Sequence, residues 1–168
     1  MPESISQSDL DKLMSLNAKL GNDTDLVKRI TIISRTIREI IGAERCTLFV
    51  RDRNVGSFWT AYADGINYIE IPQGRGIVSE VCSTGETLIE NDVESHEGFD
   101  GRVDESSGFS TRSMLAMPVR GFGGECIGVV QLLNKYDDEP FGEGDEKVLQ
   151  FVINHFAAYI QSMVHEHT

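Results

Sequence analysis

The stretch from Glu125 to Gln150 constrains the fold more than any other part of this 168-residue chain. It begins with an apolar run, Cys126 to Leu133, which is rich in β-branched residues and too short for a comfortable helix, so it predicts a strand buried on both faces. After a turn that contains Pro140, the pattern changes to helical spacing, carried by Val148, Phe151, Val152, His155, Phe156 and Tyr159. We therefore expect a central strand that leads directly into a long amphipathic helix.

Length and charge limit the class of protein. A chain of 168 residues is long enough for one domain with a full core. Its net charge of −12 argues against nucleic acid or an anionic membrane as a partner, because either would need a basic face. No apolar run reaches membrane-spanning length, and the N-terminus lacks a signal-peptide pattern, so we expect a cytoplasmic protein.

The cysteines support the same expectation. Cys46, Cys82 and Cys126 are odd in number and irregularly spaced, without a CxxC pair. Each lies among apolar or small residues. We interpret them as reduced, mostly buried cysteines of a cytosolic protein.

The N-terminal residues predict a helix with a narrow apolar stripe and a C-cap at Gly21. The stripe consists of Leu10, Leu13, Leu16 and Leu20. Such a stripe is typical of a helix that packs on another helix, so we interpret residues 1–21 as a linker or dimerisation helix and residues 22–168 as the main domain. Packing of this helix on the surface of its own domain is the alternative.

A second helix is expected from Leu26, capped by Asp23 or Thr24 and ended by Gly42. Its buried face would contain Leu26, Val27, Ile30, Ile33, Ile37, Ile40 and Ile41. Strands are expected at residues 45–51, 57–63, 68–71, 88–89, 112–120 and 125–135. A short helix at 77–82 follows several glycines, which leaves backbone amides at its N-terminus to meet an anion.

These elements predict an α+β fold: a central six-stranded antiparallel sheet with a layer of terminal helices on one face and short inserted helices on the other. The polar segment from Asn91 to Ser110 has little periodicity. A segment of this length in a compact domain is usually functional, so we interpret it as a lid, with a plain surface loop as the alternative.

The most specific motif lies at the junction of the last strand and helix: Asn134-Lys135, Phe141 and Asp145-Glu146. Lys135 at the strand end can pair with Asp145 in the first turn of the helix, where negative charge is favoured. Phe141 would fill the turn. We interpret these residues as a scaffold that braces a pocket.

This motif resembles the signature of GAF domains that bind cyclic nucleotides, as in certain phosphodiesterases and bacterial adenylyl cyclases. Residues 43–50, 71–78 and 99–113 carry the same resemblance, which covers about 26–160. It implies a regulatory domain that binds cAMP or cGMP, without a cofactor, metal or catalytic residue. The base would lie near Arg45, Cys46, Thr47, Ala63 and Asp64, the cyclic phosphate on the backbone amides of Ile77 and Val78, and the lid would contribute Asp100, Asp104, Ser107 and Thr111.

Two positions differ from the pattern of the family. Gln131 stands on the central strand where many family members have a Glu. The substitution keeps the ability to form hydrogen bonds but removes the negative charge. Asp100 stands where an aromatic residue often enters from the lid. Whether the ligand is cAMP or cGMP therefore stays open.

Other classes are weaker matches. One GAF branch reduces free methionine sulfoxide with clustered cysteines, yet Cys46 and Cys126 lie in apolar runs without a neighbouring His or Lys. A bilin chromophore would need a Cys beside a His, and Cys82 is followed by Ser83. The histidines are scattered and predict no metal site: His96, His155, His165 and His167.

The main alternative is a GAF domain that binds no ligand and serves in dimerisation and signal relay. In either case the apolar stripes of the two terminal helices predict a homodimer, and the final helix, which runs to the end of the sequence without a terminator, suggests an effector domain downstream. The sequence alone does not separate the two functions.

Overall fold

The computed structural model describes residues 5–22, 26–52, 56–61, 68–71, 76–95 and 110–167. The helices are α1 (Gln7–Asn22), α2 (Leu26–Ile41), α3 (Gly76–Thr84) and α5 (Glu143–His167), with short 3₁₀ turns at Val93–Ser95 and Tyr136–Asp138. The strands are β1 (Ala43–Arg51), β2 (Phe58–Ala61), β3 (Tyr68–Ile71), β4 (Leu88–Glu90), β5 (Met114–Arg120) and β6 (Cys126–Lys135). None of the helices in this described part is long and apolar enough to cross a membrane.

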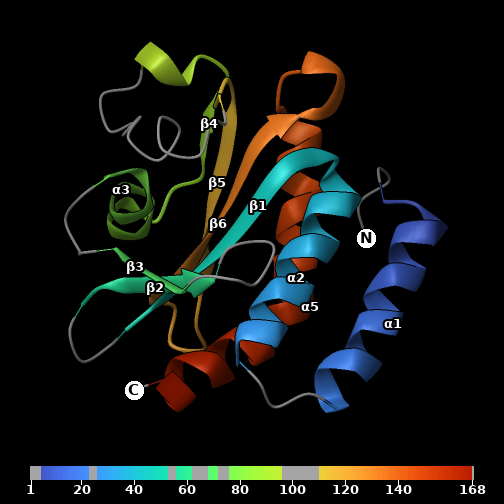
Figure 1. The fold of residues 1–168 in the computed structure, drawn as a ribbon, viewed down its shortest axis with the longest axis vertical. Coiled ribbons are helices and arrows are strands. Elements are labelled where there is room, and N and C mark those ends of the chain that lie inside the picture. Colours follow the sequence, from blue (N-terminus) through green and yellow to red (C-terminus); the bar gives the residue numbers. More distant parts are fainter. Residues whose placement is uncertain are drawn as a thin grey trace.

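The strands form one six-stranded sheet in the order β3-β2-β1-β6-β5-β4, and all neighbouring pairs are antiparallel. β6 lies at the centre, between β1 and β5, and β3 forms one edge (Figure 1). This order confirms the α+β sheet and the central strand that the apolar run predicts.

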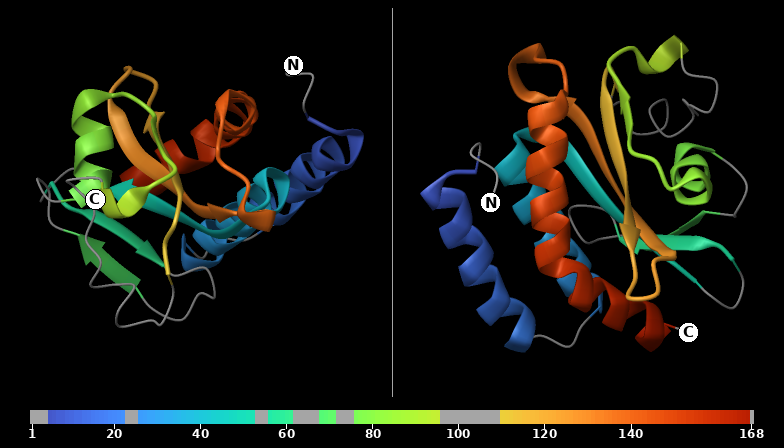
Figure 2. Two further views of the ribbon diagram at one scale, coloured as in Figure 1. Left: turned by 90° about the horizontal axis from the view of Figure 1, so that it is seen from above. Right: turned by 180° about the vertical axis from the view of Figure 1, so that it is seen from behind.

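The terminal helices cover one face of the sheet. α2 and α5 lie side by side against it, as Figures 1 and 2 show. Their apolar faces share one core with β1 and β6, and the fully buried helical residues include Ile30, Ile33, Ile37, Leu149, Val152, Phe156 and Ile160. The helix α2 ends where Gly42 adopts a φ of +80°, a backbone conformation that glycine reaches without a steric penalty.

The opposite face of the sheet carries α3 (Figure 2). A second, smaller core lies between this helix and the sheet, with Ile77, Val78 and Val81 from α3 packed against Phe49 and Val129. The two cores use alternate residues of the same strands, as the pleat requires. The predicted layering is therefore confirmed on both faces.

Helix α1 packs against α2 within the chain. Leu13 is buried in the large core, and Leu10 packs on it. Gly21 lies inside α1, so the predicted C-cap at this residue is wrong: a glycine in a helix costs only about 1 kcal/mol relative to alanine and need not end it. The side chains of Leu16 and Leu20 and the caps expected at Asp23 and Thr24 lie outside the described residues, and dimerisation stays a prediction.

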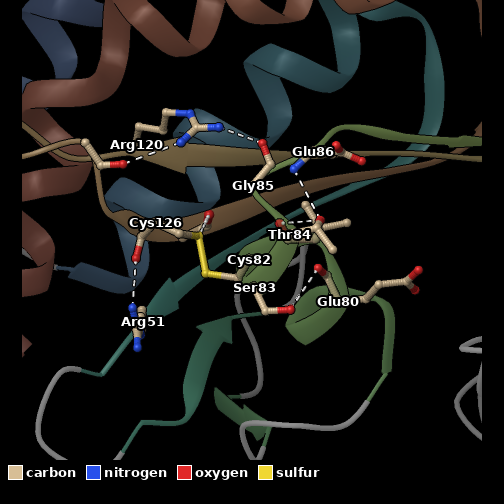
Figure 3. The surroundings of a disulfide bond; sticks show 12 residues. Arg51, Glu80, Cys82, Ser83, Thr84, Gly85, Glu86, Arg120 and Cys126 are labelled. Carbon is tan, nitrogen blue, oxygen red and sulfur yellow. Dashed lines mark hydrogen bonds between the residues drawn. A yellow bond between two sulfur atoms is a disulfide. The ribbon is translucent and has the colours of Figure 1, made fainter.

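Cys82 on α3 and Cys126 at the start of β6 form a disulfide, with their Cα atoms 5.6 Å apart (Figure 3). The expectation of three reduced cysteines is therefore wrong, and Cys46 is the free thiol among them. Three cysteines can form one disulfide and leave one free thiol. Their number alone therefore did not exclude a disulfide.

Candidate functional site

Asn134 fastens the start of β5 to the end of β6. Its side-chain oxygen accepts hydrogen bonds from the backbone N–H groups of Arg112 and Ser113, at 2.7 and 3.1 Å. Its side-chain nitrogen donates to the carbonyl oxygen of Ser110 at 2.8 Å and to Glu44 Oε2 at 2.9 Å. These bonds use the full capacity of the amide. The first residue of the motif therefore holds the chain where segment 96–109 leads into β5.

Phe141 holds the chain on the other side of that segment. Its backbone N–H donates to Asn91 Oδ1 at 2.9 Å, and its carbonyl oxygen accepts from Asn91 Nδ2 at 3.1 Å. Its ring is buried in the large core. The motif thus anchors both Asn91, just after β4, and Ser110. Asn91 gave no signal in the sequence, because its partner lies 50 residues away.

Lys135 and Asp145 form the brace that the motif predicts. Lys135 Nζ lies 2.7 Å from Asp145 Oδ1, and both side chains are mostly buried. The other carboxylate oxygen, Oδ2, accepts from the backbone N–H of Gly142 at 2.9 Å, so Asp145 also caps the first turn of α5. The predicted pair is confirmed. The Glu146 backbone N–H closes the same turn onto the Gly142 carbonyl oxygen at 3.1 Å.

Glu44 links the motif to a charged cluster that the sequence did not reveal. Its Oε1 lies 3.1 Å from Arg112 Nη2, and Arg112 Nε lies 3.1 Å from Asp138 Oδ1. The hydrogen bond from Asn134, followed by the contact with Arg112, holds the pKa of the Glu44 carboxyl below its usual range. The carboxylate is therefore the form that the fold favours.

The face of the sheet under α3 presents polar side chains in one row. Along β1, Arg45 and Thr47 alternate with Leu48 and Cys46, so they share the face of Phe49 and of the smaller core. Thr47 pairs with Gln131 across β1 and β6. Gln131 in turn pairs with Ala116 of β5 in the smaller core. Three predicted site residues therefore lie on one face.

The first turn of α3 begins at Gly76 on the same side of the sheet. The side chains of Ile77 and Val78 are buried against the sheet, which fixes the position of this turn. The backbone N–H groups of a first helical turn have no partner within the helix. Thr111 is buried and lies within residues 110–113, the segment that Asn134 holds by hydrogen bonds. Of the other predicted residues, Ala63, Asp64, Asp100, Asp104 and Ser107 lie outside the described residues.

Cys46 requires a correction. Its side chain lies in the large core, on the face covered by the terminal helices. Burial raises the pKa of this thiol far above its usual range. A side chain on this face cannot contact a ligand on the opposite face, so only the backbone of Cys46 remains available to the predicted base site.

A cavity of about 270 Å³ lies beside α3 and includes Gly76 of its first turn. Its described lining comes from α3 and from the ends of β1 and β2: Arg51, Phe58, Gly76, Ser79, Glu80, Cys82 and Ser83. Among the residues that the structure describes, none of the side chains predicted to bind a ligand lines it. The sequence did not indicate this cavity, because the residues around it come from three separate segments.

The antiparallel sheet, with terminal helices on one face and a short helix on the other, has the architecture of the GAF fold. The chain belongs to the GAF domain family, whose model matches residues 25–160.

Relatives and solved structures agree with this assignment. The chain is 31% identical over 154 residues to the dual 3′,5′-cyclic-AMP and -GMP phosphodiesterase 11A of Takifugu rubripes, which covers 83% of this chain and 17% of that protein. It superposes on the GAF domain of a phosphoenolpyruvate-protein phosphotransferase from Coxiella burnetii with a TM-score of 0.75, at 18% identity and with 94% and 95% of the two chains covered. Free methionine-R-sulfoxide reductase from Neisseria meningitidis gives a TM-score of 0.65 at 18% identity, with 97% and 95% covered. At such identities these structures show the fold alone.

Proposed function

We propose that this domain binds cAMP or cGMP intact on the sheet face beside α3 and relays the binding through its terminal helices. The observation that carries the proposal is the pairing of Thr47 with Gln131 on the sheet face that also carries α3. The similarity to a phosphodiesterase that acts on both cyclic nucleotides supports it. That phosphodiesterase is far longer than this chain, so an effector domain in the same protein is part of the proposal.

The polar row suits the edge of a purine. Gln131 offers both a donor and an acceptor through its amide, and Thr47 offers a hydroxyl that does either. Arg45, on the same face, brings a cation that can stack on a base or donate to its acceptors. A neutral Gln131 serves the edges of adenine and guanine alike, which is why both nucleotides stay in the proposal.

The cyclic phosphate would bind the first turn of α3. The chain carries a net charge of −12, so the anion needs a local source of positive potential. Oriented N–H groups at a helix N-terminus supply it without a lysine. The burial of Ile77 and Val78 holds this turn in place before a ligand arrives, which lowers the cost of binding.

The relay would pass from the sheet into α5. Lys135 ends β6, and its partner Asp145 caps the first turn of α5, so a shift of β6 is transmitted directly to that helix. Dimerisation through the terminal helices would carry the signal onward. The ligand-free relay module is the second candidate, favoured by the packing of α1, α2 and α5 in one core.

Nucleotide-dependent thermal shifts test the binding face. A ligand at 100 times its Kd stabilises the folded state by about 2.7 kcal/mol, so at least one of the two cyclic nucleotides should raise Tm while linear 5′-AMP should not. Thr47→Val and Gln131→Leu should each weaken binding about tenfold, because each removes a hydrogen bond worth about 1 to 2 kcal/mol. Gln150→Leu, on the exposed face of α5, is the matched control. A shift that survives in all three variants would place the ligand elsewhere.

A further inference from the structure

We infer that the cavity beside α3 is a site of thiol–disulfide exchange, at which a small anionic thiol attacks the Cys82 sulfur and becomes covalently attached. The inference does not rest on nucleotide binding, although Gly76 in the first turn of α3 lines the cavity and also belongs to the turn proposed for the cyclic phosphate. It depends on the disulfide, the cavity and Arg51, none of which belongs to the polar row on the sheet.

The cavity gives access to one half of the disulfide. Cys82 lines it together with Ser79 and Ser83 from the same helix, whereas Cys126 does not. Both cysteines are only half-buried. Exchange requires that a thiolate reaches one sulfur, and the sulfur it reaches decides where the mixed disulfide forms. Cys82 is therefore the attacked residue, and Cys126 is the leaving group.

Arg51 favours the departure of Cys126. Its Nη1 donates to the backbone carbonyl oxygen of Cys126 at 3.3 Å, and its side chain also lines the cavity. Figure 3 shows its guanidinium at the backbone carbonyl of Cys126, on the Cys126 side of the disulfide. A guanidinium near a sulfur stabilises the thiolate, and a better-stabilised leaving thiolate departs faster. The same cation attracts an anionic thiol to the cavity, while Glu80, which also lines it, opposes this attraction.

The reaction balances without a further oxidant. The thiolate R–S⁻ forms a new bond to Cys82 Sγ while the bond between Cys82 and Cys126 breaks, and the electron pair of that bond goes to Cys126. The Cys126 thiolate then takes a proton from water. Its sulfur lies 3.2 Å from the carbonyl oxygen of Gly128, which accepts a hydrogen bond from the new thiol. Cys126 is reduced to a thiol, the small thiol is oxidised, and Cys82 remains in a disulfide, now with the small thiol.

Opening the bond does not release α3 from the sheet. Ile77, Val78 and Val81 keep the helix in the smaller core with Phe49 and Val129. The chain therefore stays folded when the exchange occurs. In a compartment rich in small thiols the state of this bond would follow the thiol pool.

Reduced glutathione is the probe. The folded chain is incubated with it, samples are quenched with acid and then alkylated, and peptide mapping locates each modification. We expect one glutathionyl group on Cys82 and one alkyl group on Cys126, with Cys46 unmodified in native samples. A mixed disulfide on Cys126, or no opening until denaturant unfolds the chain, overturns the inference.

Arg51→Gln and Arg51→Lys test the role of the cation. Loss of the charge should slow opening, because a leaving thiol with a higher pKa departs more slowly, and Arg51→Lys should restore most of the rate. The Arg51→Gln substitution should slow opening by cysteamine, a positively charged thiol, less than it slows opening by glutathione. Arg120→Gln is the matched control, because Arg120 also donates to backbone carbonyls, those of Gly85 and Gly124, but does not line the cavity. Equal rates in Arg51→Gln and Arg120→Gln contradict the assignment.

Discussion

Asn134 and Glu44 are joined by a hydrogen bond of 2.9 Å from the amide nitrogen of Asn134 to Glu44 Oε2. The same amide holds residues 110–113, and Asn134 itself adopts a φ of +56°. Asparagine tolerates this left-handed conformation better than most residues. One side chain thus connects the end of β6, the start of β1 and the chain that leads into β5.

Asn134→Ala should lower the free energy of unfolding by about 3 kcal/mol. The change removes the bonds of the amide, leaves the N–H of Ser113 buried without its acceptor, and keeps an unfavourable φ. Chemical denaturation followed by circular dichroism measures it. Asn154→Ala, which removes an exposed amide from α5, should stay within about 0.5 kcal/mol of the parent chain. Equal losses in the two variants would contradict the role given to Asn134.

The pH dependence of stability should reveal Glu44. Its pKa is lowered in the folded state, so its contribution is present above the unfolded value of 4.5 and is lost as the pH falls through the folded value. Glu44→Gln removes this contribution, so the stability difference between parent and variant should shrink below about pH 4.5. Because the side chain is more than one third exposed, solvent screening keeps the effect small. A difference that grows as the solution is acidified would refute the assignment.

Much of this scaffold follows from the sequence. The switch from an apolar run to helical spacing identifies β6 and α5, because both patterns are long and strong. The Lys135–Asp145 pair was predictable since it spans only one turn between adjacent elements. The bonds of Asn91 and Glu44 were not, because each depends on a partner that only the tertiary fold brings near.

The cysteines show the same limit. Cys82 and Cys126 are separated by 44 residues, and the odd count concealed their bond. The position of Cys46 could have been predicted. It alternates with Arg45 and Thr47 in β1, so a strand that presents those two to a ligand must direct Cys46 to the opposite face.

Removing either partner of the brace should destabilise the fold by about 1 to 3 kcal/mol. Asp145→Ala should cost more than Lys135→Ala, because Asp145 also caps α5 through the N–H of Gly142. Urea denaturation of both single variants and the double variant gives the coupling between them. Ligand affinity should fall only as far as stability does. If Lys135→Ala retains full stability but loses all binding, Lys135 contacts the ligand and the structural role is wrong.

The disulfide should contribute about 4 kcal/mol to stability, because it closes a long loop in the unfolded chain. Denaturation of Cys126→Ser, compared with the parent chain, measures this contribution. Thiol titration adds a check. The native parent chain should show no reactive thiol, since Cys46 is buried in the core, and the denatured chain should show one. A thiol that reacts in the native state would contradict the burial of Cys46 or the presence of the bond.

Isothermal titration calorimetry with cAMP and with cGMP, followed by chromatography of the nucleotide recovered from the cell, tests the central claim most directly. The account predicts saturable binding of at least one of the two at one molecule per chain, with the nucleotide recovered intact. The paired variant Thr47→Val with Gln131→Leu should bind far more weakly. Absence of saturable binding to both nucleotides in the folded parent chain would contradict the account and leave a ligand-free relay module. Recovery of linear nucleotide would contradict binding without turnover.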